Sequence, residues 1–240
     1  MTTSATATQC VDEVVSTFGS VFSSIDGWRV AIEALISASD GVVGTDAIDP
    51  LAESLVLPRL SEPGALVIGA GYVAAPQFLA DTDWHLAWWL GHSNTFGLGA
   101  ADPGIRRLEA EEDPTAENFR DYTNLEWWRV PAQTHAPHIT GPYVDYLCTD
   151  DYTLTLTMPV MFAGRLVGMV GADLYVNEIE RTLLPVVRRI ERPATLVNAS
   201  GRVVVSTDPH RATGSILRDA LAGTTLPCGD TGLRLVLDAA

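Results

Sequence analysis

Residues 118–176 read NFRDYTNLEWWRVPAQTHAPHITGPYVDYLCTDDYTLTLTMPVMFAGRLVGMVGADLYV, and the second half of this stretch carries the clearest structural pattern in the chain. From Thr153 to Phe162 apolar and polar side chains alternate at first, and Arg165 to Tyr175 forms a second, largely apolar run. Runs of this kind predict strands. The Ala163-Gly164 pair between them supplies a tight turn, so we expect an antiparallel hairpin. The aromatic and polar first half should then lie against a sheet and close a pocket over it.

The chain on either side of this hairpin predicts a mixture of helices and strands. Apolar residues from Gln9 to Ala38 recur at the 3–4 spacing of a buried helix face, and Asp26-Gly27 is the point where an interruption is expected. A turn-rich connector is expected from Asp40 to Pro50 and a loop from Gly91 to Glu117. The other elements predicted before residue 192 are a short helix from Leu51 to Leu60, strands at Ala65 to Ala75, Trp84 to Leu90 and Gly141 to Tyr146, and a helix from Asn177 to Ile190 that Pro185 kinks or begins.

After residue 192 the chain starts a smaller module. Residues 194–198 and 202–206 flank a Gly-containing turn and predict a second hairpin. A helix near Ser215 to Ala222 and a strand from Gly232 to Leu237 are expected to complete the module. The sequence therefore predicts an α+β fold, divided into residues 1–192 and a partial second module at 193–240.

The composition excludes several functions. The formal charge of −15 repels phosphate backbones, which argues against nucleic-acid binding and favours cationic partners. All fifteen basic residues are Arg, which excludes P-loop and Schiff-base chemistry because both require Lys. We find no apolar run of the roughly 18 residues that a membrane span needs, and no secretory signal. With Cys10, Cys148 and Cys228 interpreted as free thiols, the prediction is a cytoplasmic protein that does not enter a membrane.

Three candidate sites have simpler structural interpretations. Residues 69–74 fit a loose G-x-G-x-x-A, but the chain that follows predicts hairpins, so a strand with closely packed glycines is favoured over a dinucleotide site. His135 and His138 lack a third His or Cys at ligand spacing, so we expect no metal, and either a pocket-lining role or a surface loop. The pair Asp150-Asp151 lacks the closing Glu of a calcium loop and fits a solvated turn.

The adjacent Trp127 and Trp128, followed by Tyr143, Asp145 and Asp173, form a more specific constellation. Aromatic faces with nearby carboxylates suit the recognition of organic cations. Residue types alone leave the alternative equally open, in which the indoles belong to the core and the acids are solvated.

Three segments, taken in order, resemble the Cache (PDC-type) sensor domains of bacterial chemoreceptors and sensor kinases. They are DYTNLEWW at 121–128, GPYVDY at 141–146 and LTMPVMFAGRLVGMVGADL at 156–174. More loosely, the resemblance runs from the leading helix to residue 210. It implies a long N-terminal helix packed on a PAS-like antiparallel sheet of five strands at about 65–176. A small-molecule pocket is expected between that sheet and residues 118–146.

The resemblance also implies a set of ligand-binding residues. Asp173 takes the place of the Asp that contacts a ligand amine, whereas Leu125 stands where the family's amino-acid binders carry an Arg that clamps the ligand carboxylate. Either Arg120 or Arg129 could restore that clamp by swinging into the pocket. Together with the candidates considered above, the predicted ligand-binding residues are Tyr122, Trp127, Trp128, His138, Tyr143, Asp145 and Asp173.

These observations together predict a non-enzymatic, cofactor-free sensor for an amine, another organic cation or an amino-acid-like ligand. We expect it to act in signal transduction or transcriptional control through a separate regulator protein. The apolar helix face from Val14 to Ile25 further predicts a homodimer. Two alternatives stay open: an enzyme, such as a hydrolase or isomerase using His135 or His138 in the same pocket, and a regulatory subunit with an unused pocket.

Overall fold

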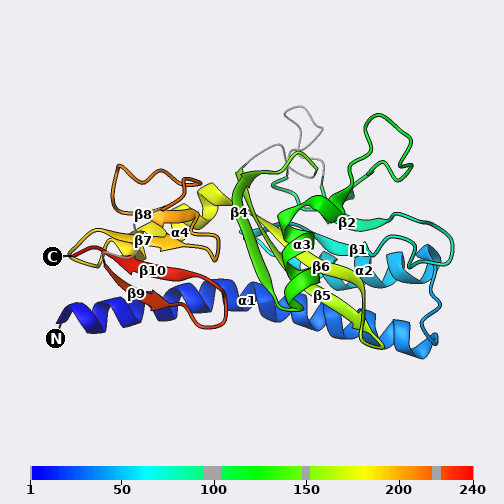
Figure 1. The fold of residues 1–240 in the computed structure, drawn as a ribbon, viewed down its shortest axis with the longest axis horizontal. Helices are drawn as coiled ribbons and strands as arrows, with labels where there is room; N and C mark the ends of the chain where they lie inside the picture. Colours follow the sequence, from blue (N-terminus) through cyan, green and yellow to red (C-terminus); the bar gives the residue numbers. More distant parts are fainter. Residues whose placement is uncertain (1, 95–103, 148–151, 218–222, 240) are drawn as a thin grey trace.

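The computed structural model describes residues 2–94, 104–147, 152–217 and 223–239. Its larger sheet has six strands, and neighbouring strands are antiparallel throughout (Figure 1). In spatial order they are β3 (Arg106–Arg107), β2 (Leu86–Leu90), β1 (Val67–Ala74), β6 (Arg165–Tyr175), β5 (Tyr152–Phe162) and β4 (His138–Val144). The predicted α+β class and PAS-like sheet are confirmed.

The hairpin predicted from the 153–175 stretch is confirmed almost residue for residue. Strands β5 and β6 are joined by Ala163 and Gly164, whose φ angles of 48° and 77° lie in the left-handed region that Gly adopts without strain. The prediction of five strands was one short. The additional strand, β3, lies in the 91–117 segment that was expected to be a loop, of which residues 95–103 lie outside the described residues.

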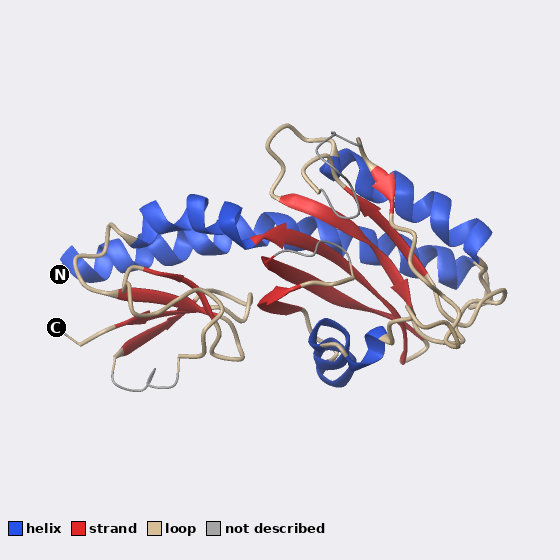
Figure 2. Cartoon of the chain, turned by 90° about the horizontal axis from the view of Figure 1, so that it is seen from above, coloured by secondary structure: helices blue, strands red, loops and turns tan. Residues whose placement is uncertain are grey.

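Both faces of the larger sheet are covered, so its central strands are buried on both sides. Helices α1 (Thr2–Ala38) and α2 (Thr45–Leu60) lie on one face, and α3 (Glu126–Thr134) lies on the other (Figure 2). Alternation along β2 separates its two indoles, because Trp89 packs in the core with the long helices and Trp88 packs in the aromatic core beside α3. Because successive side chains of a strand point to opposite faces of the sheet, only every second residue of β2 can reach a site under α3.

Helix α1 is continuous, so the predicted interruption at Asp26-Gly27 is wrong. An exposed Gly costs a helix about 1 kcal/mol relative to Ala, which is less than the roughly 1.5–3 kcal/mol gained by burying each large apolar side chain. Ile25 and Trp28, on either side, are both buried. Arg29 adds ion pairs to Asp26 and Glu33 across this turn, each at 2.7 Å.

The apolar face of α1 that motivated the homodimer is used within the chain. Val14, Phe18, Val21 and Ile25 are each 0% exposed, packed against the chain's own sheets and helices. A dimer through α1 would therefore have to use its other face. The dimer itself stays a prediction.

Two helix boundaries differ from the sequence prediction. Helix α2 begins at Thr45, inside the predicted 40–50 connector, because the Asp81 carboxylate accepts hydrogen bonds from the Thr45 backbone N–H and hydroxyl and so fixes the first turn. Helix α4 (Val176–Val187) begins at Val176. Pro185 lies in its last turn, so the helix does not begin at this residue.

The C-terminal residues form a second antiparallel sheet. Its order is β8 (Val203–Ser206), β7 (Ala194–Val197), β10 (Arg234–Leu237) and β9 (Thr224–Pro227). Strand β9 was not predicted, and the predicted helix near 215–222 is wrong at residues 215–217, where Ile216 forms a β-bridge with Arg202. Residues 218–222 of that prediction lie outside the described residues.

The two sheets share α1, whose N-terminal half runs along the second sheet and whose C-terminal half runs along the first (Figure 1). The division at residue 193 as a domain boundary stays a prediction. Within the described residues, no helix combines the length and apolarity needed to cross a bilayer.

Candidate functional site

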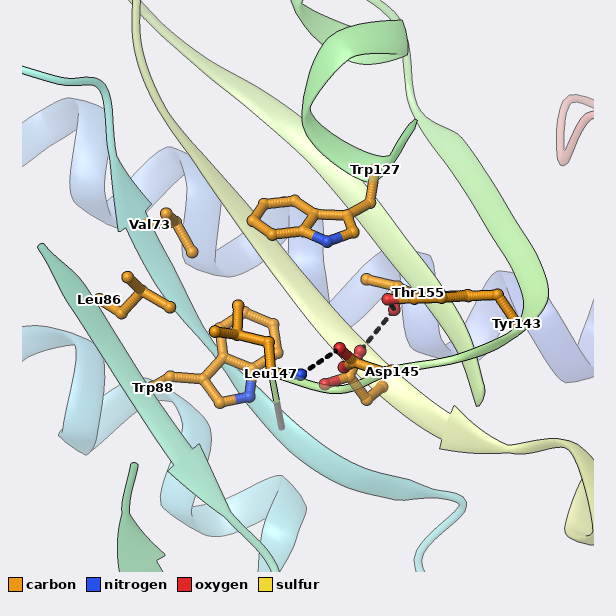
Figure 3. Close-up of a pocket in the computed structure, with 9 residues that line it drawn as sticks. Val73, Leu86, Trp88, Trp127, Tyr143, Asp145, Leu147 and Thr155 are labelled. Atoms are coloured by element: carbon orange, nitrogen blue, oxygen red, sulfur yellow. Dashed lines mark hydrogen bonds between the residues drawn. The ribbon is translucent and has the colours of Figure 1, made fainter. Parts of the chain in front are cut away.

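A small cavity lies between the larger sheet and α3, where the sequence predicted a pocket. Figure 3 shows Trp127 extending from α3 and Trp88 from β2 toward this space, with Tyr143 and Asp145 on the β4 side. The cavity volume is about 20 Å³, room for about one water molecule. Its lining consists of Val73, Leu86, Trp88, Trp127, Tyr143, Asp145, Leu147, Thr155 and Asp173.

Strand register places the polar lining residues together. Thr155 of β5 lies directly opposite Asp173 of β6, and Asp173 in turn lies opposite Gly69 of β1. Residues paired in this way on neighbouring strands point to the same face of the sheet. Helix α3 is held over this face because the Thr157 hydroxyl donates a hydrogen bond of 2.9 Å to the Trp127 carbonyl.

A chain of hydrogen bonds ends at Asp173. The Thr155 hydroxyl donates to Asp173 Oδ1 at 2.7 Å, and the Tyr143 hydroxyl lies 2.8 Å from Thr155 Oγ1. Since a Thr hydroxyl has one hydrogen and it is directed to Asp173, Tyr143 donates to Thr155. The other oxygen of the carboxyl group, Asp173 Oδ2, is buried and has no hydrogen-bond partner among the described residues.

Asp173 is an acid in an environment that disfavours its charged form. Burial and the nearby Asp145 raise its pKa well above the usual range, and the hydrogen bond from Thr155 opposes this only in part. Asp145 is also buried, and its Oδ1 accepts a hydrogen bond of 3.0 Å from the Leu147 backbone N–H. A positive charge placed beside the two carboxyl groups would lower the pKa of Asp173 and so oppose both effects.

The cavity contains four of the seven residues that the sequence predicted to bind a ligand. They are Trp127, Tyr143, Asp145 and Asp173. Their role in ligand binding stays a prediction.

Tyr122 and Trp128 pack behind the cavity and do not line it. Both belong to the aromatic core with Trp127, and the Tyr122 ring centroid lies 5.1 Å from that of Trp128. The Tyr122 hydroxyl donates a hydrogen bond of 2.7 Å to the Ala74 carbonyl, which ties the residues just before α3 to the end of β1. For these two residues, the structure matches the alternative in which the aromatic residues form core.

The two His residues do not meet at a common site. His138 is buried on β4, outside the cavity lining, with its Nε2 3.0 Å from Glu126 Oε1. His135 is exposed at the end of α3, where its φ of 54° terminates the helix. Among the described residues, no cluster of three or more His, Cys, Asp or Glu side chains is arranged to hold a metal ion.

Sequence reasoning missed Trp88 and Thr155. Thr155 could have been found from the alternation TLTLT, which places it on the same face as Thr153 and Thr157. Trp88 could not have been found from the sequence, because it stands beside Trp89 in WHLAWWL. Only the packing of the sheet decides which of the two indoles faces the cavity.

The other sequence candidates have structural roles. Gly69 and Gly71 lie within β1, and a Cβ at Gly71 would come within 2.1 Å of the Ala87 carbonyl oxygen, so the predicted close packing is confirmed. Cys10 and Cys228 are buried free thiols. Cys148 and the Asp150-Asp151 pair lie outside the described residues.

An antiparallel sheet behind a long helix, with an aromatic segment closing a cavity that holds buried acids, is the architecture of a PAS-like fold. Residues 103–181 match the model of the first PDC sensor domain of methyl-accepting-chemotaxis-protein-like proteins. This match covers the segment that carries the sequence resemblance, and it supports that resemblance to Cache-type sensor domains of the PDC class.

The solved structures of similar fold include chemotaxis-protein and chemoreceptor domains. "Methyl-accepting Chemotaxis protein X" is 13% identical, with a TM-score of 0.63 over 97% of this chain and 93% of that one. The ligand-binding domain of Pseudomonas fluorescens chemoreceptor CtaA, in complex with L-isoleucine, is 16% identical, with a TM-score of 0.58 over 95% and 87%. That of Pseudomonas aeruginosa PctC, in complex with GABA, is 15% identical, with a TM-score of 0.54 over 96% and 95%. No curated protein sequence matches the chain.

Proposed function

We propose that this protein is a small-molecule sensor whose pocket binds an organic ammonium ion without a carboxylate group. The observation that supports this most directly is the buried Asp173, with one oxygen unpartnered among the described residues and the Asp145 carboxyl group nearby. An ammonium group donates the hydrogen bond that Asp173 Oδ2 lacks and supplies the opposite charge. Trp127 and Tyr143 add aromatic faces, each worth roughly 0.5–2 kcal/mol to a desolvated cation.

Among the described residues, the lining of this cavity offers a ligand carboxylate no cationic partner. Leu125, at the position of the family's clamping Arg, is the N-cap residue of α3 and packs in the aromatic core. Arg120 and Arg129 are exposed, and neither lines the cavity. A carboxylate buried beside two acids without a cation is unfavourable, so selection against amino acids is expected. The amino acids and GABA bound by the similar chemoreceptors carry such a carboxylate.

The ligand is expected to be compact. The cavity of about 20 Å³ accommodates about one water molecule, so the lining side chains must move apart for any organic amine. That movement costs packing free energy, and the cost grows with ligand size.

Thermal-shift and calorimetric titrations at pH 7 with paired ligands test the proposal, each pair being an amine and its α-carboxylated parent. The amine should stabilise the protein more than the amino acid, and Asp173→Asn should remove the effect because Asn keeps the shape but carries no negative charge. Asp12→Asn, at an exposed position on α1, is the matched control and should leave the effect intact. Stronger binding of the amino acid, lost in Arg120→Ala, would show the amine proposal to be wrong.

The output of the sensor belongs to the same proposal. We infer that a separate regulator protein reads the liganded state in the cytoplasm and that the chain forms a homodimer through α1. Since the Val14–Ile25 face is buried, the contact would involve the opposite face, where Val30 is 52% exposed. Sedimentation of wild type and Val30→Asp distinguishes the cases, because only a dimer through this face dissociates on substitution.

The enzyme alternative receives no support from the geometry. His138 hydrogen-bonds Glu126 away from the cavity, and His135 is exposed at the far end of α3. Neither imidazole lines the space in which a ligand would be held.

A further inference from the structure

The cavity contains two buried polar atoms that are unpartnered among the described residues, and the proposed ammonium group satisfies one of them. Asp173 Oδ2 is the acceptor, and Trp88 Nε1 is a donor. The side chains that carry them are almost fully buried, with Asp173 1% and Trp88 4% exposed. Buried polar groups in native proteins nearly always have a partner, so an indole N–H without one at the edge of a cavity is informative.

The donor and the acceptor face the same small space above Gly69. A Cβ on Gly69 would lie 2.9 Å from Trp88 Nε1 and 3.3 Å from Asp173 Oδ2. Any other residue at position 69 would therefore occupy the space between the two atoms. One compact molecule can contact both, with a donating group toward Asp173 and an accepting atom toward Trp88.

We propose that Trp88 Nε1–H donates a hydrogen bond to a neutral acceptor atom of the ligand, so that Trp88 determines specificity among amines. This rests on the proposed function. The ligand class is a compact ammonium ion that carries an ether, hydroxyl or carbonyl oxygen within a few bonds of the nitrogen.

The ligand group that meets Trp88 is expected to be an acceptor and to be neutral. An indole N–H can only donate, so it requires an accepting atom. An anionic acceptor would stand close to the carboxyl groups of Asp145 and Asp173, where burial and the charge of Asp145 already raise the pKa of Asp173. A site built to hydrogen-bond a ligand atom discriminates strongly against an analogue without that atom, because its own polar group is then left unpaired.

Isothermal titration calorimetry with 2-methoxyethylamine and n-butylamine tests this inference. The two amines have equal numbers of heavy atoms, are both ammonium ions at pH 7, and differ by one oxygen in place of one methylene group. The wild type should bind the ether amine more tightly. In Trp88→Phe the ratio of the two affinities should fall about tenfold, since one buried hydrogen bond is lost.

Two variants complete the design. Trp127→Phe is the matched control, since it replaces an indole in the same cavity but leaves Trp88 in place; the two affinities should change in parallel and their ratio should persist. Asp173→Asn should weaken both amines. An affinity ratio that is the same in wild type and Trp88→Phe overturns the role of Trp88 and leaves the proposed function standing. The same result is expected if a bridging water satisfies the indole whatever the ligand. Failure of both amines to bind in an Asp173-dependent way overturns the proposed function and this inference with it.

A second measurement covers the case in which Trp88→Phe does not fold. In ¹⁵N-labelled wild type, the ether amine should move one buried indole N–H resonance downfield, and butylamine should not. The absence of such a ligand-specific shift overturns the inference.

Discussion

At the scale of the single residue, His85 shows how the fold uses a buried charge. Its Nε2 lies 2.7 Å from Asp49 of α2, and its Nδ1 lies 2.8 Å from Glu112. Burial alone would lower its pKa, but the hydrogen bonds and charges of these two acids outweigh it and raise the pKa to about 9. The imidazolium therefore joins α2 to β2 and to the 104–117 segment. None of these groups lines the cavity, so the role is structural.

His85 predicts a loss of stability at alkaline pH. Because the folded-state pKa of about 9 exceeds the unfolded value of about 6.5, the contribution is fully present below pH 6.5 and is lost as the pH rises through 9. The difference corresponds to about 3 kcal/mol. Urea unfolding at pH 6.5 and 9.5 should show this decline in the wild type and a much flatter profile in His85→Gln. Parallel profiles for the two proteins would contradict the assignment.

At the scale of the element, α3 and β4 connect the cavity to the second sheet. Trp127 of α3 lines the cavity, and its neighbour Glu126 accepts a hydrogen bond of 3.1 Å from Ser200, in the turn between β7 and β8. Asn198 is fully buried and directly follows β7. Its side chain donates a hydrogen bond of 2.7 Å to the Gly141 carbonyl of β4 and accepts one from the Arg202 backbone N–H. These hydrogen bonds tie α3 and β4 directly to the β7–β8 turn.

Asn198→Ala should destabilise the protein and loosen β4. Two buried hydrogen bonds are lost and the Gly141 carbonyl is left without its donor, so we expect the free energy of unfolding to fall by about 1–3 kcal/mol. Hydrogen exchange should accelerate in β4 more than in β1. Ser200→Ala is the matched control, because it removes one exposed contact from the same turn and should cost less than about 0.5 kcal/mol. Equal effects of the two substitutions would argue against Asn198 as the main connection.

Elements were predictable from sequence where local signals decide them. The β5–β6 hairpin followed from alternation and one turn, both of which are properties of neighbouring residues. Strand β9 was missed because Thr224–Pro227 is short and largely exposed, and it forms only by pairing with β10. The site follows the same rule. Asp173 and Tyr143 were found through an ordered motif, whereas Trp88 depends on which face of a distant strand turns toward α3.

At the scale of the whole molecule, α1 is the common support of both sheets. Its N-terminal half runs along the second sheet (Figure 1), and Cys10 and Cys228 belong to one continuous core. An ion pair between Glu13 and Arg189 ties this half of α1 to the residue just beyond α4. The second sheet therefore packs against residues from the beginning of the chain and covers an apolar helix face that would otherwise meet water.

Removal of residues 193–240 should expose that face and unfold the first turns of α1. We expect circular dichroism of the 1–192 fragment to show less helix than the native helices α1–α4 would give if they stayed intact. We also expect the fragment to associate in solution. The full chain should unfold in a single cooperative transition, since one core includes both sheets. A monomeric 1–192 fragment with its native helix content would show instead that residue 193 is a true domain boundary.

The continuity of α1 also sets a length scale for mechanics. At 1.5 Å per residue, a helix of 37 residues is a rod of about 55 Å. A tilt of about 5° around its middle would displace each end by about 2 Å, given that length. A small rotation of α1 where it lies along the first sheet would thus shift its opposite end, along the second sheet, by more than the length of a covalent bond. The ratio of the two displacements would be set by where the two sheets contact the helix.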